Sequence, residues 1–240
     1  MRSIHDNLQA VRERIARAAT GAGRDPRGVS LLAVSKTHAA TLVGEAFSAG
    51  QRAFGENYVQ EALDKMDVLA GKLGQERARA LEWHLIGPLQ SNKTRVAAAR
   101  FDWVQTVESE KIARRLSGQR SGNLPPLNVL IQVNVSGESS KSGIAPSAAL
   151  ALANSISKLP RLKLRGLMAI PEPTTDAGMQ RLRFSEVRKT FLEMKQHGHE
   201  VDTLSMGMSD DMESAIAEGS TMVRIGTAIF GARRPVKDAA

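Results

Sequence analysis

The sequence predicts an α/β fold in which eight parallel strands and their helices close into a single (β/α)8 TIM barrel. Eight short apolar runs alternate with helix-like segments along the 240 residues. Such an order forms parallel sheets, because each helix returns the chain to the same edge of the sheet. The first run is followed by Ser-Lys-Thr-His and lacks the Gly-x-Gly-x-x-Gly fingerprint of an open, doubly wound nucleotide-binding sheet. A chain of this length fits one domain, and we expect residues 1–240 to form it.

The predicted strands are apolar, β-branched runs bounded by glycine or polar residues. They cover residues 29–34, 53–55, 83–87, 103–107, 129–135, 164–170, 203–208 and 222–230. The predicted helices cover residues 39–49, 58–72, 91–100, 109–118, 146–159, 177–196 and 210–217. Residues 136–143, rich in Gly and Ser, are the main candidate for a mobile loop.

No helix of useful length is expected after the eighth strand, so its place on the barrel needs another cover. Near the N-terminus, one apolar helical stripe contains Ile4, Leu8, Val11, Ile15 and Ala18. We expect a helix over about residues 1–22 that packs beside strand eight, and a polar tail over about residues 232–240. The basic face of the N-terminal helix would also suit a membrane-surface helix or a transit peptide, but Asp6 and Glu13 interrupt the positive charge.

Composition limits the function classes. The formal net charge of +8 raises a polyanion as a partner, yet the basic residues are dispersed and only 4% of residues are aromatic. We therefore expect no specific nucleic-acid binding. Without cysteine, the chain has no disulfide, thiolate metal site or cysteine nucleophile, which is compatible with a reducing cytosol. No apolar stretch is long enough to span a bilayer, so we expect a soluble, cytoplasmic protein without a membrane partner.

The first candidate for chemistry is Lys36, which follows the first strand directly. Polar residues at the C-terminal ends of barrel strands converge on one mouth. Partial burial there would disfavour the ammonium form of the lysine and release an amine for Schiff-base chemistry. The alternative is a lysine that keeps its amino group in solvent.

The last predicted strand supplies the second candidate. Arg224 has apolar neighbours on both sides, so its guanidinium needs an acceptor from a ligand or from a structural carboxylate. Gly226 allows close backbone approach, and Thr227 offers an N–H and a hydroxyl. Phosphates often bind near strands seven and eight of such barrels.

Residues 205–213 form the third candidate, because strand seven passes there into a helix whose first N–H groups are free to bind an anion. Asp210 and Asp211 would repel a phosphate, and Asp210 with Glu213 suits a capping box. We therefore assign phosphate contact to Ser209 and expect both aspartates to point outward.

Together with these positions, several ordered segments resemble the YggS/PROSC family of pyridoxal-phosphate-binding homeostasis proteins, which is related in fold to the barrel domain of alanine racemase. The segments are residues 33–37 (AVSKT), 54–61 (FGENYVQE), 83–93 (WHLIGPLQSNK), 133–135 (VNV), 141–143 (KSG), 166–168 (GLM), 204–211 (LSMGMSDD) and 223–231 (VRIGTAIFG).

The resemblance implies pyridoxal 5′-phosphate as the cofactor, with a Schiff base on Lys36 and Arg224 at the pyridine nitrogen. It implies further cofactor contacts by Met208, Ser209, Gly226 and Thr227. It also suggests that Asn57 and His84 line the ring pocket, although a core or supporting role for His84 is equally compatible. Lys93 and Lys141 are weaker candidates for electrostatic guidance of the cofactor.

The resemblance also implies a carrier without robust catalytic activity, for which we assign no catalytic residue. A guanidinium at the pyridine nitrogen weakens the cofactor as an electron sink. The racemase's second base, a tyrosine from another domain, has no counterpart, since the sole tyrosine is Tyr58. We expect a monomer that buffers the cofactor and delivers it to apo enzymes, with effects on amino-acid and keto-acid pools. The alternative is an amino-acid racemase or another Schiff-base enzyme. We expect no metal site, because His197 and His199 lack further ligands at defined spacing.

Overall fold

The computed structural model describes residues 3–136 and 142–232. Eight parallel strands form a closed barrel in the order β1 to β8, with β8 paired to β1. The fold class predicted from the sequence is therefore confirmed. The strands are β1 (Ser30–Val34), β2 (Ala53–Glu56), β3 (Glu82–Leu85), β4 (Trp103–Val107), β5 (Leu127–Val133), β6 (Leu162–Ala169), β7 (Thr203–Ser205) and β8 (Met222–Ile225).

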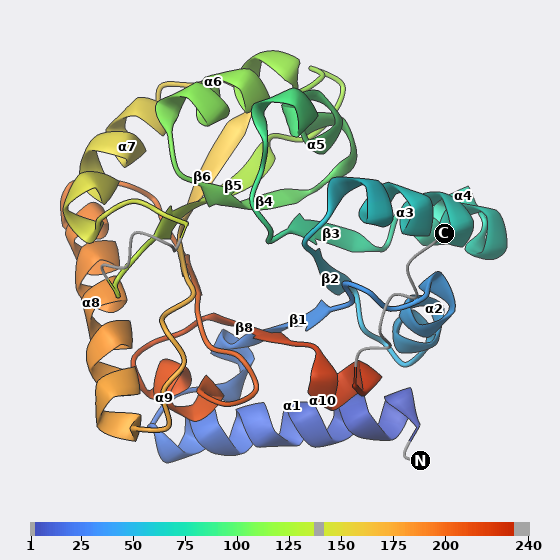
Figure 1. Cartoon of the computed structure of the whole chain (residues 1–240), viewed down its shortest axis with the longest axis horizontal. Helices are drawn as coiled ribbons and strands as arrows, with labels where there is room; N and C mark the ends of the chain where they lie inside the picture. The colour runs from blue at the N-terminus through green and yellow to red at the C-terminus, as the bar shows by residue number, and fades with distance from the viewer. Residues whose placement is uncertain (1–2, 137–141, 233–240) are drawn as a thin grey trace, which may run out of the picture.

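Helices surround the barrel (Figure 1). The α-helices of the described residues are α1 (Ile4–Gly21), α2 (Ala40–Ser48), α3 (Val59–Leu73), α4 (Gln75–Ala78), α5 (Thr94–Arg100), α6 (Glu110–Gln119), α7 (Ala149–Ile156), α8 (Ala177–Gln196), α9 (Met212–Ala217) and α10 (Thr227–Phe230). Short 3-10 turns are η1 (Pro26–Gly28), η2 (Ser91–Lys93) and η3 (Pro146–Ala148). Within this part of the chain, no helix combines the length and apolarity needed to cross a bilayer.

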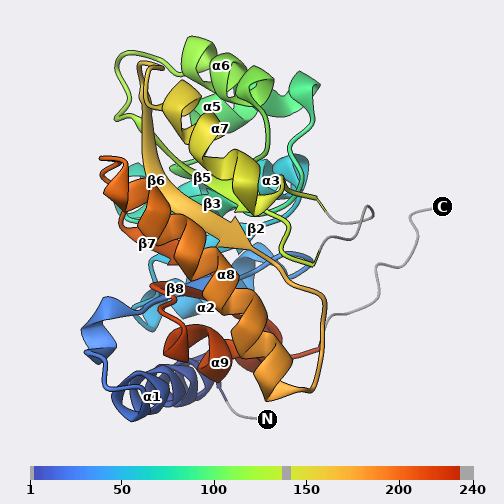
Figure 2. The same cartoon turned by 90° about the vertical axis from the view of Figure 1, so that its left-hand side faces the viewer.

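The N-terminal helix α1 covers the gap beside the last strand, as its apolar stripe predicts. It packs against α2, α9 and α10 (Figures 1 and 2). Leu8, Val11 and Ile15 are buried in this interface. The side-chain amide of Asn7 also donates a 2.9 Å hydrogen bond to the carbonyl of Ile229 in α10.

The last two strands are shorter than the sequence predicts. Strand β7 ends at Ser205, and β8 ends at Ile225, where its pairing with Ala33 of β1 is the final register pair. The apolar residues beyond Gly226 form the short helix α10. An apolar run of this length fits a buried strand or a buried helix equally well, so its period could not separate the two.

The barrel interior contains polar as well as apolar side chains. Because side chains alternate along a strand, every second residue points inward. Small apolar clusters form around Leu32 and Met222, and around Trp103 and Leu130. Buried His84, Gln105, Ser205 and Arg224 lie on the inward-facing positions of β3, β4, β7 and β8. The interior is thus partly hydrophilic, which matters for the site above it.

Candidate functional site

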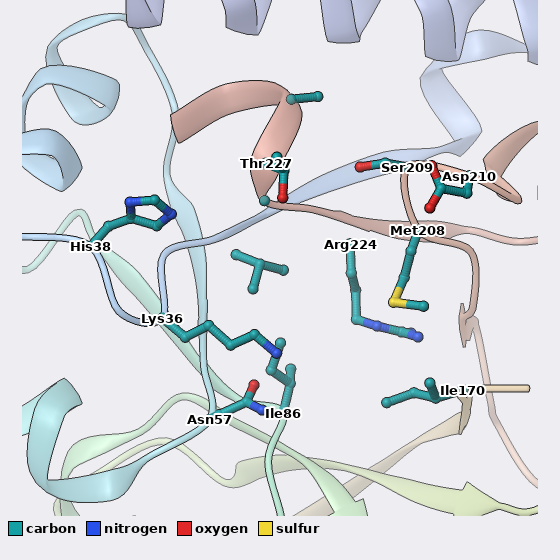
Figure 3. A pocket seen from close by; sticks show the side chains of 13 residues that line it. Lys36, His38, Asn57, Ile86, Ile170, Met208, Ser209, Asp210, Arg224 and Thr227 are labelled. Atoms are coloured by element: carbon teal, nitrogen blue, oxygen red, sulfur yellow. The ribbon is translucent and has the colours of Figure 1, made fainter. Parts of the chain in front are cut away.

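A cavity of about 520 Å³ opens at the C-terminal ends of the strands (Figure 3). In a β/α barrel this end collects the residues that follow different strands. Its lining comes from the ends of β1, β2, β3, β6 and β8 and from the segment after β7. The lining residues are Val34, Lys36, His38, Asn57, Ile86, Ile170, Met208, Ser209, Asp210, Arg224, Gly226, Thr227 and Ala228.

Lys36 reaches this cavity from a turn that is bonded on both sides. Ser35 Oγ donates to Glu56 Oε1 at 2.6 Å, and the Ser35 carbonyl accepts from Lys65 Nζ at 2.6 Å. Thr37 has a left-handed backbone (φ 64°), and its amide donates to Glu61 Oε1 at 2.5 Å. A non-glycine residue holds this conformation only where its surroundings fix it. The turn therefore fixes the backbone on both sides of Lys36.

Arg224 lies in the wall of the cavity and is only 3% exposed. Its Nη1 donates to Ser205 O at 2.7 Å and to Ser205 Oγ at 2.8 Å, while Nη2 donates to Ala169 O at 2.8 Å. Among the described residues no carboxylate forms an ion pair with it. Burial lowers the pKa of Arg224 to about 10, so the guanidinium is still protonated at neutral pH. The carboxyl of Asp211 acts on Arg224 through space and opposes this lowering of its pKa, but the two side chains form no ion pair.

Polar groups that suit an anion gather where β8 passes into α10. Gly226 packs tightly there, since a Cβ would lie 3.1 Å from the carbonyl of Val34. The first N–H groups of a helix have no acceptor within that helix. Thr227 starts α10, and Ser209 faces the same cavity from the segment after β7 (Figure 3).

The sequence suggested that Asp210 and Asp211 both point outward, but only Asp210 is exposed. Asp211 is partly buried, and its Oδ1 accepts from the Met208 amide at 2.6 Å. Burial raises the pKa of this carboxyl. Asp210 is exposed and belongs to the cavity lining. The predicted capping box is also wrong, because α9 starts after Asp211 without a side-chain cap.

Asn57 reaches the cavity, whereas His84 does not. Asn57 follows β2, and Gly87 lets the two loops approach, since a Cβ on Gly87 would lie 2.2 Å from the Asn57 carbonyl oxygen. His84 is fully buried inside the barrel, where it bonds Glu82 and Gln105 and stacks on Trp103. Strand alternation places it one layer below Ile86, which follows β3 and does line the cavity. The expectation of a ring-pocket contact by His84 is therefore not met.

Several lining residues were not predicted from the sequence. Ile86 and Ile170 directly follow β3 and β6, but apolar residues at strand ends carry no chemical signal. His38 lies two residues beyond Lys36, and its ring is 5.2 Å from that of Phe230. Its position just after the first strand is a signal that could have identified it.

Other residues considered from the sequence lie away from the cavity. Lys93 is exposed in η2 and does not line it, and Lys141 and the tail from residue 233 lie outside the described residues. Tyr58 is 60% exposed in a separate groove beside α3. His199 bonds Asn154 and Ser157, and the described residues hold no cluster of three or more metal-ligating side chains.

The family described as alanine racemase, N-terminal domain, matches residues 7–234. Pyridoxal phosphate homeostasis proteins of Pseudomonas aeruginosa and Escherichia coli K12 are 56% and 54% identical. Each alignment covers 97% of this chain, and 97% and 98% of the respective relatives.

Solved structures extend the comparison. PipY of Synechococcus elongatus PCC7942, with PLP bound, is 36% identical over 95% of this chain and 100% of its own, with a TM-score of 0.80. Alanine racemase of Clostridium difficile 630 is 15% identical, with a TM-score of 0.68 over 97% of this chain and 58% of its own, and it shows the shared fold alone. The chain therefore belongs to the alanine racemase N-terminal domain family and, within it, to the pyridoxal phosphate homeostasis proteins.

Proposed function

We propose that this chain binds pyridoxal 5′-phosphate (PLP) between Lys36 and Arg224, buffers it and delivers it to apo enzymes. The observation that carries the proposal is one cavity with an amine, a buried guanidinium and a cluster of anion-binding groups. When bound, PLP supplies an aldehyde that condenses with a lysine amine. PipY with PLP bound shares the fold, and the homeostasis proteins share more than half of the sequence.

The residues of the cavity fit this cofactor in three ways. Of the five N–H groups of Arg224, two have no acceptor among the described residues, which suits the lone pair of a pyridine nitrogen. Ser209, Thr227 and the first N–H groups of α10 suit a phosphate. Ile86, Ile170 and Met208 supply apolar surface for a ring.

We further propose that the protein has little catalytic power. A fixed cation at the pyridine nitrogen disfavours protonation there and weakens stabilisation of a carbanion. Tyr58 does not line the cavity but lies in a neighbouring groove that shares His38 with it, so we assign it no role as a second base. We also propose that the protein is a cytosolic monomer. Light scattering would measure its mass in solution.

The test is an absorbance titration of the purified chain with PLP. We expect a saturable band that Lys36→Ala abolishes and that Lys72→Ala, which removes an exposed lysine outside the cavity lining, leaves intact. Transfer is then followed as activity regained by an apo enzyme while a competing amine scavenges free PLP. No band in the wild-type chain, or the same band in Lys36→Ala, would overturn the proposal.

One observation favours a Schiff-base enzyme as a second candidate. His38 lines the cavity and carries an imidazole, the side chain that most often serves as a general acid or base in enzymes. Incubating the PLP-loaded protein with amino acids in deuterated water separates the two functions. Exchange of the α-proton that is lost in His38→Asn would support the enzyme, and no exchange across a panel of amino acids would support the carrier.

A further inference from the structure

A continuous hydrogen-bonded chain runs through the barrel interior from the far end of β3 to Arg224. Glu82 Oε1 is 2.7 Å from His84 Nε2, and His84 Nδ1 is 2.8 Å from Gln105 Nε2. Gln105 Oε1 accepts from Ser205 Oγ at 2.7 Å, and Ser205 Oγ accepts from Arg224 Nη1 at 2.8 Å. Four strands contribute to it: β3, β4, β7 and β8.

The donors along this chain all point the same way. Gln105 Nε2 donates to His84 Nδ1 and also contacts Met222 Sδ at 3.2 Å, so the amide oxygen is left to accept from Ser205. His84 must then carry its proton on Nε2 and donate it to Glu82. Burial lowers the pKa of His84, which favours this neutral ring. Each hydrogen bond is therefore donated in the direction from the Arg224 guanidinium toward the Glu82 carboxylate.

The side chains of this hydrogen-bonded network are held tightly. His84, Gln105 and Ser205 are fully buried, and the His84 ring stacks on Trp103 with 5.0 Å between centroids and 9° between planes. Arg224 reaches the cavity at one end with 3% exposure, and Glu82 lies at the other end with 47% of its side chain exposed. A buried and directionally consistent network of this kind fixes the orientation of its members.

We infer that Ser205, Gln105 and His84 are positioning residues that orient Arg224 toward the ring nitrogen of the cofactor. This inference rests on the proposed function. None of the three lines the cavity, so each acts through the next. Ser205 Oγ can accept from Arg224 in a fixed direction only because its own proton is taken by Gln105. Without Gln105 the hydroxyl rotates, and Nη1 keeps only the carbonyl of Ser205.

The test measures the hydrogen bond at the ring nitrogen directly. Ser205→Ala and Gln105→Leu are loaded with PLP labelled with ¹⁵N in the ring. We expect the ¹⁵N chemical shift to move in both variants and the Kd for PLP to rise by about three- to tenfold. The control is Ser117→Ala, which removes another buried hydroxyl, one that donates to Pro160 O at 2.5 Å and does not line the cavity.

A double-variant cycle addresses the coupling. If Gln105 acts through Ser205, Gln105→Leu should add little to the effect of Ser205→Ala on the Kd. An unchanged ¹⁵N shift and an unchanged Kd in both single variants, each folded by circular dichroism, would overturn the inference. So would full additivity of the two effects.

Failure of the inference is distinct from failure of the proposed function. If the wild-type chain takes up no PLP, the proposed function fails. If the wild-type chain binds PLP and the variants behave like Ser117→Ala, only the positioning role fails.

Discussion

Two buried cations near the cavity have opposite surroundings. Lys65, 5% exposed on α3, contacts two carboxylates, with Nζ 2.7 Å from Glu56 Oε1 and 2.6 Å from Glu61 Oε1. Arg224, 3% exposed on β8, donates only to neutral oxygens of Ser205 and Ala169. Two contacting carboxylates neutralise the first charge, whereas Asp211 acts on the second only through space, without an ion pair. A buried charge without a contacting carboxylate is costly, and such groups cluster at functional sites.

The Lys65 cluster supports the turn that carries Lys36. Lys65 bonds the carbonyl of Ser35, Glu56 accepts from the Ser35 hydroxyl, and Glu61 accepts from the Thr37 amide. Burial raises the pKa of Glu56, and the ammonium of Lys65 opposes that rise. The cluster therefore supports the structure around Lys36, whereas we propose that the Arg224 side binds the cofactor.

The largest expected effect is the loss of Lys65. In Lys65→Met, the buried Glu56 and the partly exposed Glu61 lose their cation, and breaking a buried pair in this way costs about 3–5 kcal/mol. Urea unfolding of the PLP-free protein measures the change. The control is Lys72→Met on the same helix, where the lysine is exposed. Equal stabilities of the two variants would contradict the structural role.

Arg224→Met should lower the affinity for PLP more than the stability of the PLP-free protein. Methionine removes the cost of burying the charge but leaves the carbonyls of Ser205 and Ala169 without this donor, so the PLP-free protein should lose no more than about 1–3 kcal/mol of stability. PLP affinity, measured by absorbance titration, should fall by at least about tenfold, because a charge-assisted hydrogen bond is lost. A large loss of stability with unchanged affinity would reverse the comparison.

The pH dependence of the free energy of unfolding reports on the buried His84. Burial lowers the pKa of His84 below its ordinary value of about 6.5. As the pH falls below that value, the unfolded chain takes up a proton before the folded one, so stability decreases. The slope is at most about 1.4 kcal/mol per pH unit.

His84→Gln should flatten this slope between pH 6.5 and the lowered pKa of the folded state, because glutamine does not titrate. Unfolding curves at a series of pH values measure the difference. A wild-type slope that persists in His84→Gln would assign it to other groups, of which the half-buried His199 also has a pKa lowered by burial.

The smallest effect is expected at the surface. Arg14 Nε lies 2.5 Å from Glu213 Oε1 and joins α1 to α9, but the two side chains are 37% and 51% exposed. Such pairs contribute about 0–1 kcal/mol. Glu213→Gln should therefore shift the unfolding midpoint only slightly, and less still at high salt. A loss as large as that of Lys65→Met would show that pairing alone, without burial, sets the energy.

The sequence predicted those parts of the site that depend on strand order. Lys36, Asn57 and Gly226 follow β1, β2 and β8, and barrel closure brings such positions together. The apolar lining at Ile86 and Ile170 could not be predicted, since most strand ends carry an apolar residue that only packs.

The interior chain of hydrogen bonds was also beyond sequence reasoning. The family resemblance suggests His84 at the ring pocket, with a core or supporting role as the alternative. Its actual place depends on the inward face of β3 and on partners in β4 and β7. The inward turn of Asp211 similarly depends on one backbone amide, that of Met208. Such contacts arise from tertiary packing and have no periodic signal.

The most direct test of the account is the identity of the modified lysine. PLP-loaded protein is reduced with borohydride, digested and mapped by mass spectrometry. We predict one stoichiometric adduct, on Lys36, that disappears in Lys36→Ala. A principal adduct on another lysine, Lys65 included, would contradict the division of the two buried cations into a structural cluster and a binding site.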